Sequence, residues 1–358
     1  MTLKDRHDKA LHTTLPSYPP ETHDMSPLMK EHAEAGAWVE EQREALSQHR
    51  AFARIEGCIV WADTRDTNGN QLVPVDSQAI LDEINSEGLP LLVGHDPGAP
   101  SGRIMAARLF TDADGRRFVA AVAGIYSNET RVGFADLGLT EPIEATPPTQ
   151  LPSLPNNFGF QIATDPREVS TEWLDELTHD APVGIVRRDL SHNAAEPLQE
   201  LIRIAWPYVV VVWNPFVTTI AKEAGKDAYA AVHQWFRKFL TRLSERMNPI
   251  VEIQAHQRDC HVSFLFRGKD VERNYAAHDK LPLAGAQAAK LIDHLLARDV
   301  QPRTLVYEFE PDLKKWYPSF AELIDGRIVT DRNVLIAFEN LPTGLSLGLV
   351  RHDDPRIG

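Results

Sequence analysis

Residues 89–104 read Leu89-Pro-Leu-Leu-Val-Gly-His95-Asp96-Pro-Gly-Ala-Pro-Ser101-Gly102-Arg103-Ile104. The apolar segment 89–93 is typical of a strand, and the Asp-Pro-Gly that follows is typical of a turn. Two further strand-like segments, 102–110 and 118–126, flank the turn Asp112-Ala-Asp-Gly115, which predicts a hairpin. We therefore expect residues 89–126 to form antiparallel β structure.

Similar strand-like segments occur on both sides of this hairpin. They are residues 52–61, 157–162, 198–204 and 209–212. The five prolines between residues 139 and 157 indicate an irregular loop. Many short strands with few helices predict a small antiparallel β-barrel or sandwich over residues 52–215. Residues 1–51 are expected to form a mobile tail and then a helix.

The pattern changes after Pro215. Residues 227–246 place Phe236, Phe239, Leu243 and other apolar residues at helical spacing, and Pro249 follows, which predicts an amphipathic helix. Further strand-like segments alternate with a second helical segment at 284–298. This alternation predicts a two-layer α/β domain over residues 216–358. The fold class expected for the whole chain is therefore α+β: a small antiparallel barrel followed by an α/β domain.

The composition excludes several classes of protein. The chain has 358 residues, with 37 basic and 51 acidic side chains and a formal charge of −14, which disfavours a non-specific nucleic-acid binder. Only Cys58 and Cys260 are present, so no disulfide framework is expected and a reducing compartment is favoured. The polar N-terminus does not read as a signal peptide. The apolar run at 204–220 is broken by prolines, so we expect a soluble, cytoplasmic protein without membrane contact.

Familiar catalytic and cofactor motifs are weak or absent. Gly344-Leu-Ser-Leu-Gly348 resembles a nucleophile elbow, but too few residues follow it for the required helix. His256, Cys260 and His261 are close in sequence, but a closed zinc site needs a second group of donors. Neither a G-x-x-x-x-G-K nor a G-x-G-x-x-G string occurs. We therefore expect no cofactor and no metal.

The strings around residue 95 do resemble a known family. Asp66-Thr-Asn-Gly-Asn, the His95-Asp96 string leading to Gly102-Arg103, and Asn157-Phe-Gly-Phe160 follow one another in the order seen in phage prohead (capsid maturation) serine proteases. The resemblance covers residues 52–210. It implies a small β-barrel core like that of the herpesvirus assemblins, and a serine endopeptidase ancestry.

Carried over to this sequence, the resemblance makes His95 the general base and puts Asn157 where the family has its nucleophilic serine. An asparagine amide cannot replace a serine hydroxyl in acyl transfer. Ser153 lies four residues earlier and is the alternative nucleophile, and Glu200 is the nearest match for the residue that orients the base. Outside catalysis, His95 would cap a strand within its turn, and Glu200 would be a surface carboxylate on an edge strand.

Three functions remain open from the sequence. The first is a pseudoenzyme, a protease-like binding or assembly protein without catalytic activity. The second is an active serine endopeptidase with His95 as general base, and the third is a sensor or effector protein that acts through residues 216–358. We expect a protein or peptide partner and no nucleic acid, and homo-oligomerisation stays open.

Overall fold

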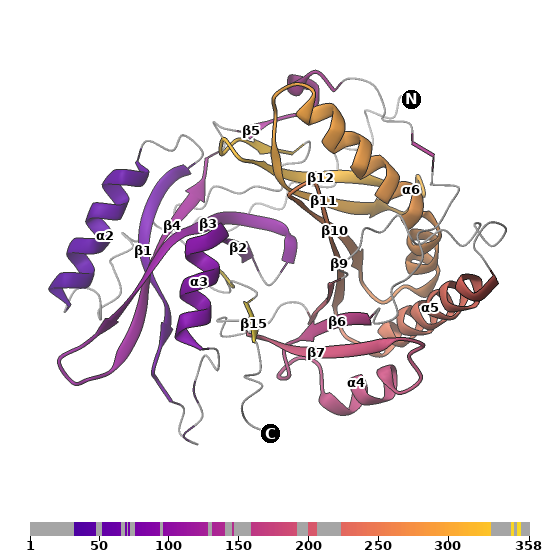
Figure 1. Cartoon of the computed structure of the whole chain (residues 1–358), viewed down its shortest axis with the longest axis horizontal. Helices are drawn as coiled ribbons and strands as arrows, with labels where there is room; N and C mark the ends of the chain where they lie inside the picture. The colour runs from indigo at the N-terminus through magenta and orange to yellow at the C-terminus, as the bar shows by residue number, and fades with distance from the viewer. Residues whose placement is uncertain are drawn as a thin grey trace, which may run out of the picture.

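The computed structural model shows a mixed α+β protein with two β-sheets (Figure 1). It describes residues 32–47, 52–65, 69, 71, 76–93, 96–127, 131–139, 145–146, 159–191, 200–205, 223–330, 345–346 and 349–351. The expected fold class, α+β, is confirmed at this level. Among the helices that the structure describes, none is long and apolar enough to cross a membrane.

The first sheet has five antiparallel strands in the order β1-β4-β3-β2-β14. Their bounds are β1 Phe52–Ala62, β2 Leu89–Val93, β3 Asp96–Thr111, β4 Arg117–Tyr126 and β14 Leu345–Ser346. The predicted hairpin is confirmed, because β3 and β4 pair on either side of the turn at residues 112–115. Helices α2 (Ala33–Leu46) and α3 (Ser77–Glu87) pack on its two faces.

The alternation of β4 explains why both faces of this sheet are covered. Phe118, Ala120 and Val122 pack with α2, whereas Val119 and Ala121 pack with α3. Successive side chains of a strand point to opposite faces. An apolar run on both faces therefore requires a helix on each side.

The second sheet has ten strands in the order β15-β7-β6-β8-β9-β10-β11-β12-β13-β5. Their bounds are β5 Arg131–Val132, β6 Gly159–Thr164, β7 Gly184–Ser191, β8 Glu200–Ala205, β9 Pro249–Gln257, β10 Cys260–Arg267, β11 Pro302–Glu310, β12 Lys315–Leu323, β13 Ile328–Val329 and β15 Leu349–Arg351. The pairs β6–β7, β8–β9 and β10–β11 are parallel. A helix connects the two strands of each of these three pairs, as such a crossover requires. The short strands β13 and β5, far apart in the chain, are also parallel.

These crossover helices cover one face of the second sheet (Figure 1). They are α4 (Thr171–Thr178), α5 (Glu223–Arg242) and α6 (Val271–Leu296). The predicted apolar stripe of α5 is confirmed: Phe236, Phe239 and Leu243 in the following 3₁₀ turn η6 (Leu243–Glu245) are all buried in this core. Burial of each large side chain contributes roughly 1.5–3 kcal/mol.

Two expectations about the layout need correction. The strand-like segments 157–162 and 198–204, expected in the first domain, correspond to β6 and β8 of the second sheet, where β8 pairs directly with β9. The segment 209–212 lies outside the described residues. The sheet therefore continues across the boundary expected at residue 215, because α5 returns the chain alongside β8. Within the described residues the first sheet also does not close into a barrel, since β1 and β14 are its two edges.

Polar and apolar contacts join the two sheets. The Arg103 Nη1 atom on β3 lies 2.7 Å from Glu322 Oε2 on β12, and both side chains are buried. Asp96 at the start of β3 accepts two hydrogen bonds from Arg267 on β10, at 2.7 and 2.8 Å. Tyr126 packs against Phe320 in an apolar cluster between the sheets. The face of the second sheet opposite its helices is thus partly covered by β3 and β4.

Candidate functional site

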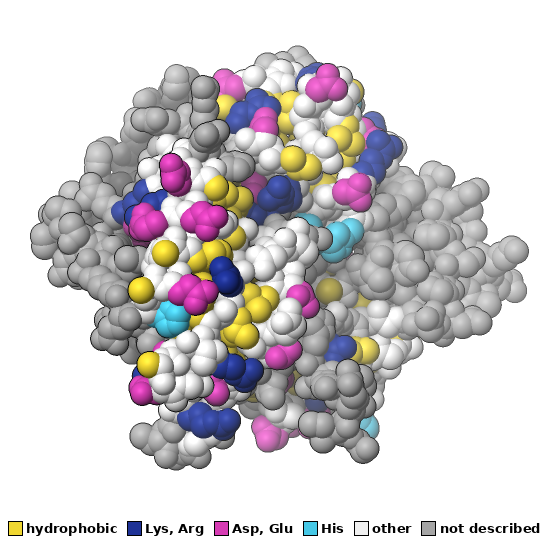
Figure 2. All heavy atoms as spheres, turned by 60° about the vertical axis from the view of Figure 1, so that its left-hand side comes forward, with side chains coloured by type: hydrophobic (Ala, Val, Ile, Leu, Met, Phe, Trp, Pro, Cys, Tyr) yellow, Lys and Arg dark blue, Asp and Glu magenta, His cyan; other side chains and the backbone are white. Residues whose placement is uncertain are grey.

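A cleft of about 550 Å³ lies between the polar face of the second sheet and the α3–β2–β3 part of the first. That volume is in the range of ligand pockets. Its wall comes from β8, β9, β10, β11 and β12 on one side and from α3, β2 and β3 on the other. On the face of the molecule seen in Figure 2, basic and acidic side chains are interspersed, without a large patch of one sign.

Strand alternation puts the polar side chains of the β9–β10 hairpin into this cleft. Gln254 is opposite Ser263, and His256 is opposite His261, across the two strands. The intervening residues Ile253 and Val262 face the helical core instead. One face of the hairpin is therefore apolar and buried under helices, while the other supplies hydrogen-bonding groups to the cleft.

Glu252 lies at the base of the cleft and is only 3% exposed. Its carboxylate accepts hydrogen bonds from Arg203 Nε and Ser263 Oγ, both at 2.7 Å, and from Gln254 Nε2 at 3.0 Å. Burial alone would raise the pKa of Glu252, but the charge of Arg203 and these hydrogen bonds hold it below its usual value. Glu252 is thus an ionised, fully engaged group that fixes the wall of the cleft.

The opposite end of the wall contains a second buried carboxylate, Glu322. Arg103 Nη1 is 2.7 Å from it and Arg303 Nη1 is 3.6 Å from it. Burial and the negative charge of Glu322 raise the pKa of the neighbouring Tyr126 well above its usual value, so this phenol stays neutral. Sequence analysis missed the Arg103–Glu322 pair because 219 positions separate the two residues.

The two histidines of the hairpin face each other at the cleft. Their Nε2 atoms are 3.2 Å apart, and their ring centroids are 3.9 Å apart. Cys260, which the sequence places beside them, points into the opposite core and is fully buried. Burial raises the pKa of its thiol to about 12. Cys260 therefore cannot join the histidines as a third ligand.

Of the residues assigned to a protease site, only Glu200 lies in the described part of the chain. His95, Ser153 and Asn157 lie outside the described residues. Glu200 accepts hydrogen bonds from Arg246 Nη2 at 2.9 Å and from the Met247 backbone N–H at 3.2 Å. The assignment of His95, Ser153 and Glu200 to catalysis therefore stays a prediction, as does the placement of Asn157 at the nucleophile position.

Glu200 lies on the helix-covered face of the second sheet. Ile202 and Ile204, on the same face of β8, belong to the core beneath the helices, so Glu200 faces the helical layer. Asp96, the neighbour of His95 in sequence, contacts Arg267 on β10. Because Phe266 belongs to the helical core, the next residue, Arg267, lies on the face of the second sheet away from the helices. Glu200 stabilises the β8 start rather than the turn at Asp96.

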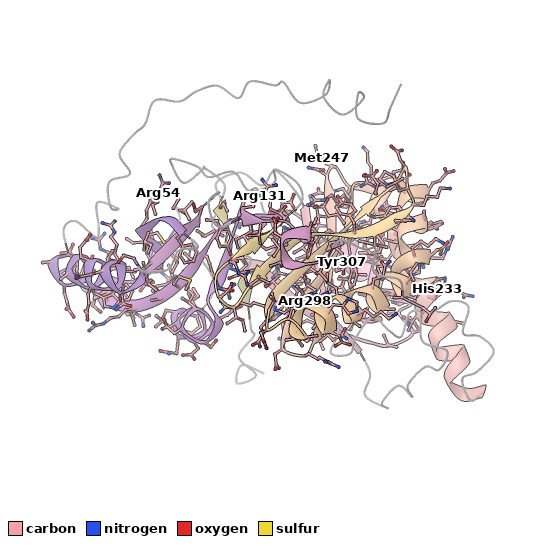
Figure 3. The ribbon with its side chains drawn as sticks, turned by 90° about the horizontal axis from the view of Figure 1, so that it is seen from above. Arg54, Arg131, His233, Met247, Arg298 and Tyr307 are labelled. Carbon is pink, nitrogen blue, oxygen red and sulfur yellow. The ribbon has the colours of Figure 1, made fainter. Side chains whose placement is uncertain are left out.

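A second group of potential metal ligands lies between α5 and α6. One donor atom each from His233, His278 and Asp279 lie within 4.8 Å of one another. Burial lowers the pKa of His278 well below its usual value, and the two imidazole rings stack at 4.4 Å. Figure 3 shows His233 at the end of the molecule away from the five-stranded sheet. Sequence analysis missed this group, because the two histidines are 45 positions apart in the chain.

In that helical group, the Asp279 carboxylate is already paired with an arginine side chain. Arg237 Nη1 donates to Asp279 Oδ1 at 2.8 Å, and its guanidinium stacks over Tyr275 at 3.9 Å. The two imidazole rings stack with an interplanar angle of 23°. This arrangement is better suited to helix packing than to holding an ion.

Comparisons with known proteins do not assign the chain to a family. No family model matches it, and neither a curated protein nor a solved structure matches. The cleft and its chemistry are therefore the basis for any functional conclusion.

Proposed function

We propose that this protein is a binding protein without protease activity, and that it holds a peptide segment of a partner protein in the cleft between the two sheets. The supporting observation is the charge pairing of the cleft wall. Glu252 is neutralised by Arg203, and Glu322 by Arg103 and Arg303. A cleft whose charges are paired internally favours a ligand that forms neutral hydrogen bonds, as a peptide backbone does.

The edge of β2 supports a peptide over a compact ligand. Leu89, Pro90 and Leu92 line the cleft, and in the described residues β14 pairs only with Leu92 and Val93. An extended peptide can add to such a sheet edge through main-chain hydrogen bonds. The side chains of Thr304 and His261 on the facing wall would then provide selectivity.

The absence of catalysis remains part of the proposal. Asn157 stands at the expected nucleophile position, and an amide cannot form an acyl-enzyme. Glu200, the expected orienting residue, is engaged by Arg246. We also propose descent from a prohead protease-like barrel.

We further propose a cytoplasmic location. Cys58 and Cys260 are both free thiols, and burial raises the pKa of each to about 12. Two unreactive, unpaired thiols suit a reducing compartment.

A peptide-binding titration tests the proposal. Fluorescence anisotropy with labelled eight-residue peptides of neutral, acidic and basic composition is measured on the full chain and on Thr304→Trp, which fills the cleft. Thr171→Trp, at an exposed helix position, is the matched control. We expect neutral peptides to bind, and Thr304→Trp to weaken binding at least tenfold while the control does not.

The same protein preparations distinguish the alternatives. Labelling by a fluorophosphonate probe at Ser153 that disappears in His95→Ala would overturn the non-catalytic proposal and establish the endopeptidase. If no peptide binds, or Thr304→Trp binds as tightly as the unmodified chain, the cleft is not the peptide site.

A further inference from the structure

We propose that His256 and His261 form a binding site for a divalent transition-metal ion of the zinc class at the cleft. Imidazole nitrogens are ligands for zinc, copper and nickel. This inference is independent of the peptide proposal, because it requires only the β9–β10 hairpin and can be tested with the metal alone.

The backbone of the hairpin keeps the two histidines opposite each other. Arg258 and Asp259 form its two-residue turn, with φ angles of 48° and 63°. Both lie in the left-handed region that a type I′ turn requires and that non-glycine residues rarely adopt. Arg258 also forms an exposed ion pair of 2.7 Å with Asp293 on α6. A tight turn of this kind leaves little freedom in register, so His256 and His261 stay opposite each other.

The separation of the two nitrogen atoms matches metal chelation. Two ligands at Zn–N distances of 2.0–2.1 Å and a tetrahedral angle lie about 3.3–3.4 Å apart. The Nε2 atoms of His256 and His261 are 3.2 Å apart. A metal would take the place of the hydrogen bond between these nitrogens, and the ring that had donated its Nε2 proton would carry that proton on Nδ1. Little rearrangement of the hairpin is needed.

The two rings also differ from the helical pair in how they are oriented. Their planes are inclined by 61°, against 23° for His233 and His278. In the helical pair, Asp279 is already bound to Arg237, whereas the two hairpin imidazoles are hydrogen-bonded to each other at the cleft. A cation at the helical group would compete with Arg237 for Asp279, whereas at the hairpin it would replace one hydrogen bond between two neutral rings.

Two protein ligands leave the other coordination positions of the metal facing the cleft. Water would fill them in the free protein, as it does at zinc sites that keep an open position. A donor atom of a cleft-bound ligand could replace that water. The site would then contribute to recognition of the ligand rather than to folding.

Isothermal titration of the full chain with zinc chloride tests this inference. The variants are His256→Gln, His261→Gln and the double variant, because glutamine keeps a hydrogen-bonding side chain on each strand. His233→Gln is the matched control in the helical group. The chain contains 14 histidines, so weak background binding is subtracted by means of the double variant.

We expect one zinc equivalent whose Kd rises at least tenfold in each single hairpin variant, with no greater loss in the double variant, since either substitution removes the chelate. The zinc-induced rise in the unfolding midpoint should disappear in the same variants and persist in His233→Gln. Circular dichroism with chelator present establishes that each variant is folded. Equal zinc binding in the unmodified chain and the double variant would overturn the proposal, as would a loss confined to His233→Gln.

Discussion

The ion pair between Arg103 and Glu322 should contribute strongly to stability, because it joins the two sheets through buried charges. Their side chains are 6% and 7% exposed. Arg103→Met keeps the apolar part of the side chain but leaves the Glu322 carboxylate without its nearest cation. Removal of one partner of a buried pair costs about 3–5 kcal/mol.

The second arginine reduces this cost. Arg303 lies 3.6 Å from Glu322, so it would neutralise part of the charge left behind by Arg103→Met. We therefore expect the free energy of unfolding to fall by about 3 kcal/mol, the lower end of the range. Replacing both partners, in Arg103→Met/Glu322→Leu, should recover part of this loss, because no uncompensated carboxylate remains buried.

Urea unfolding followed by tryptophan fluorescence measures the effect. Trp61 is buried in the first sheet and Trp316 in the core of the second, so both sheets report. Arg108→Met is the matched control: Arg108 is on the same strand, but its ion pair with Glu34 is exposed, and such a pair is worth at most about 1 kcal/mol. Equal losses for Arg103→Met and Arg108→Met, or a double variant less stable than Arg103→Met, would refute the reasoning.

Three further predictions concern the cores and the cleft wall. Because the folded state lowers the pKa of Glu252, its ion pair with Arg203 stabilises the protein above about pH 4.5 and is lost on acidification below it; Glu252→Gln should lower stability at pH 7 and flatten the acid limb of a stability-versus-pH curve. Phe239→Ala should cost about 3–5 kcal/mol in urea unfolding, because the ring is fully buried in the helical core; a loss below 1 kcal/mol would contradict that packing. Gly102→Ala should lower the thermal unfolding midpoint, because its Cβ would lie 2.2 Å from a backbone oxygen of β4, whereas Gly184→Ala has no atom within 4 Å and should be tolerated.

The sequence predicted those parts of the fold that depend on local pattern. The β3–β4 hairpin follows from two strand-like segments around Asp112-Ala-Asp-Gly115, and α5 follows from apolar residues at helical spacing. Each of these patterns is complete within about 25 residues, and the principle that converts it into structure needs no distant partner. The hairpin and the helix were predicted correctly because their patterns are local.

The division into domains could not be predicted in the same way. β8 and β9 pair in parallel, and a parallel pair is separated by a crossover, here α5 and the segments around it. The sequence shows a change in pattern at residue 215, but a β-α-β crossover produces the same change inside one sheet. The pattern therefore located the helix correctly and assigned the wrong meaning to the boundary.

The cleft shows why a functional surface is harder to infer than a core. Residues 252, 254, 256, 261 and 263 are polar and alternate with apolar residues, which by itself predicts a sheet with one solvated face. Yet Glu252 and Ser263 are 3% and 5% exposed. A polar face can be buried only where other groups satisfy it, and the Arg203 and Gln254 side chains do so for Glu252. On the same face, the charge that balances Glu322 comes from β3 of the other sheet. The pattern of one strand therefore reveals the polar residues that line the cleft. It does not reveal their charged partners, such as Arg103 on β3, because the pattern of that strand gives no sign of the contact.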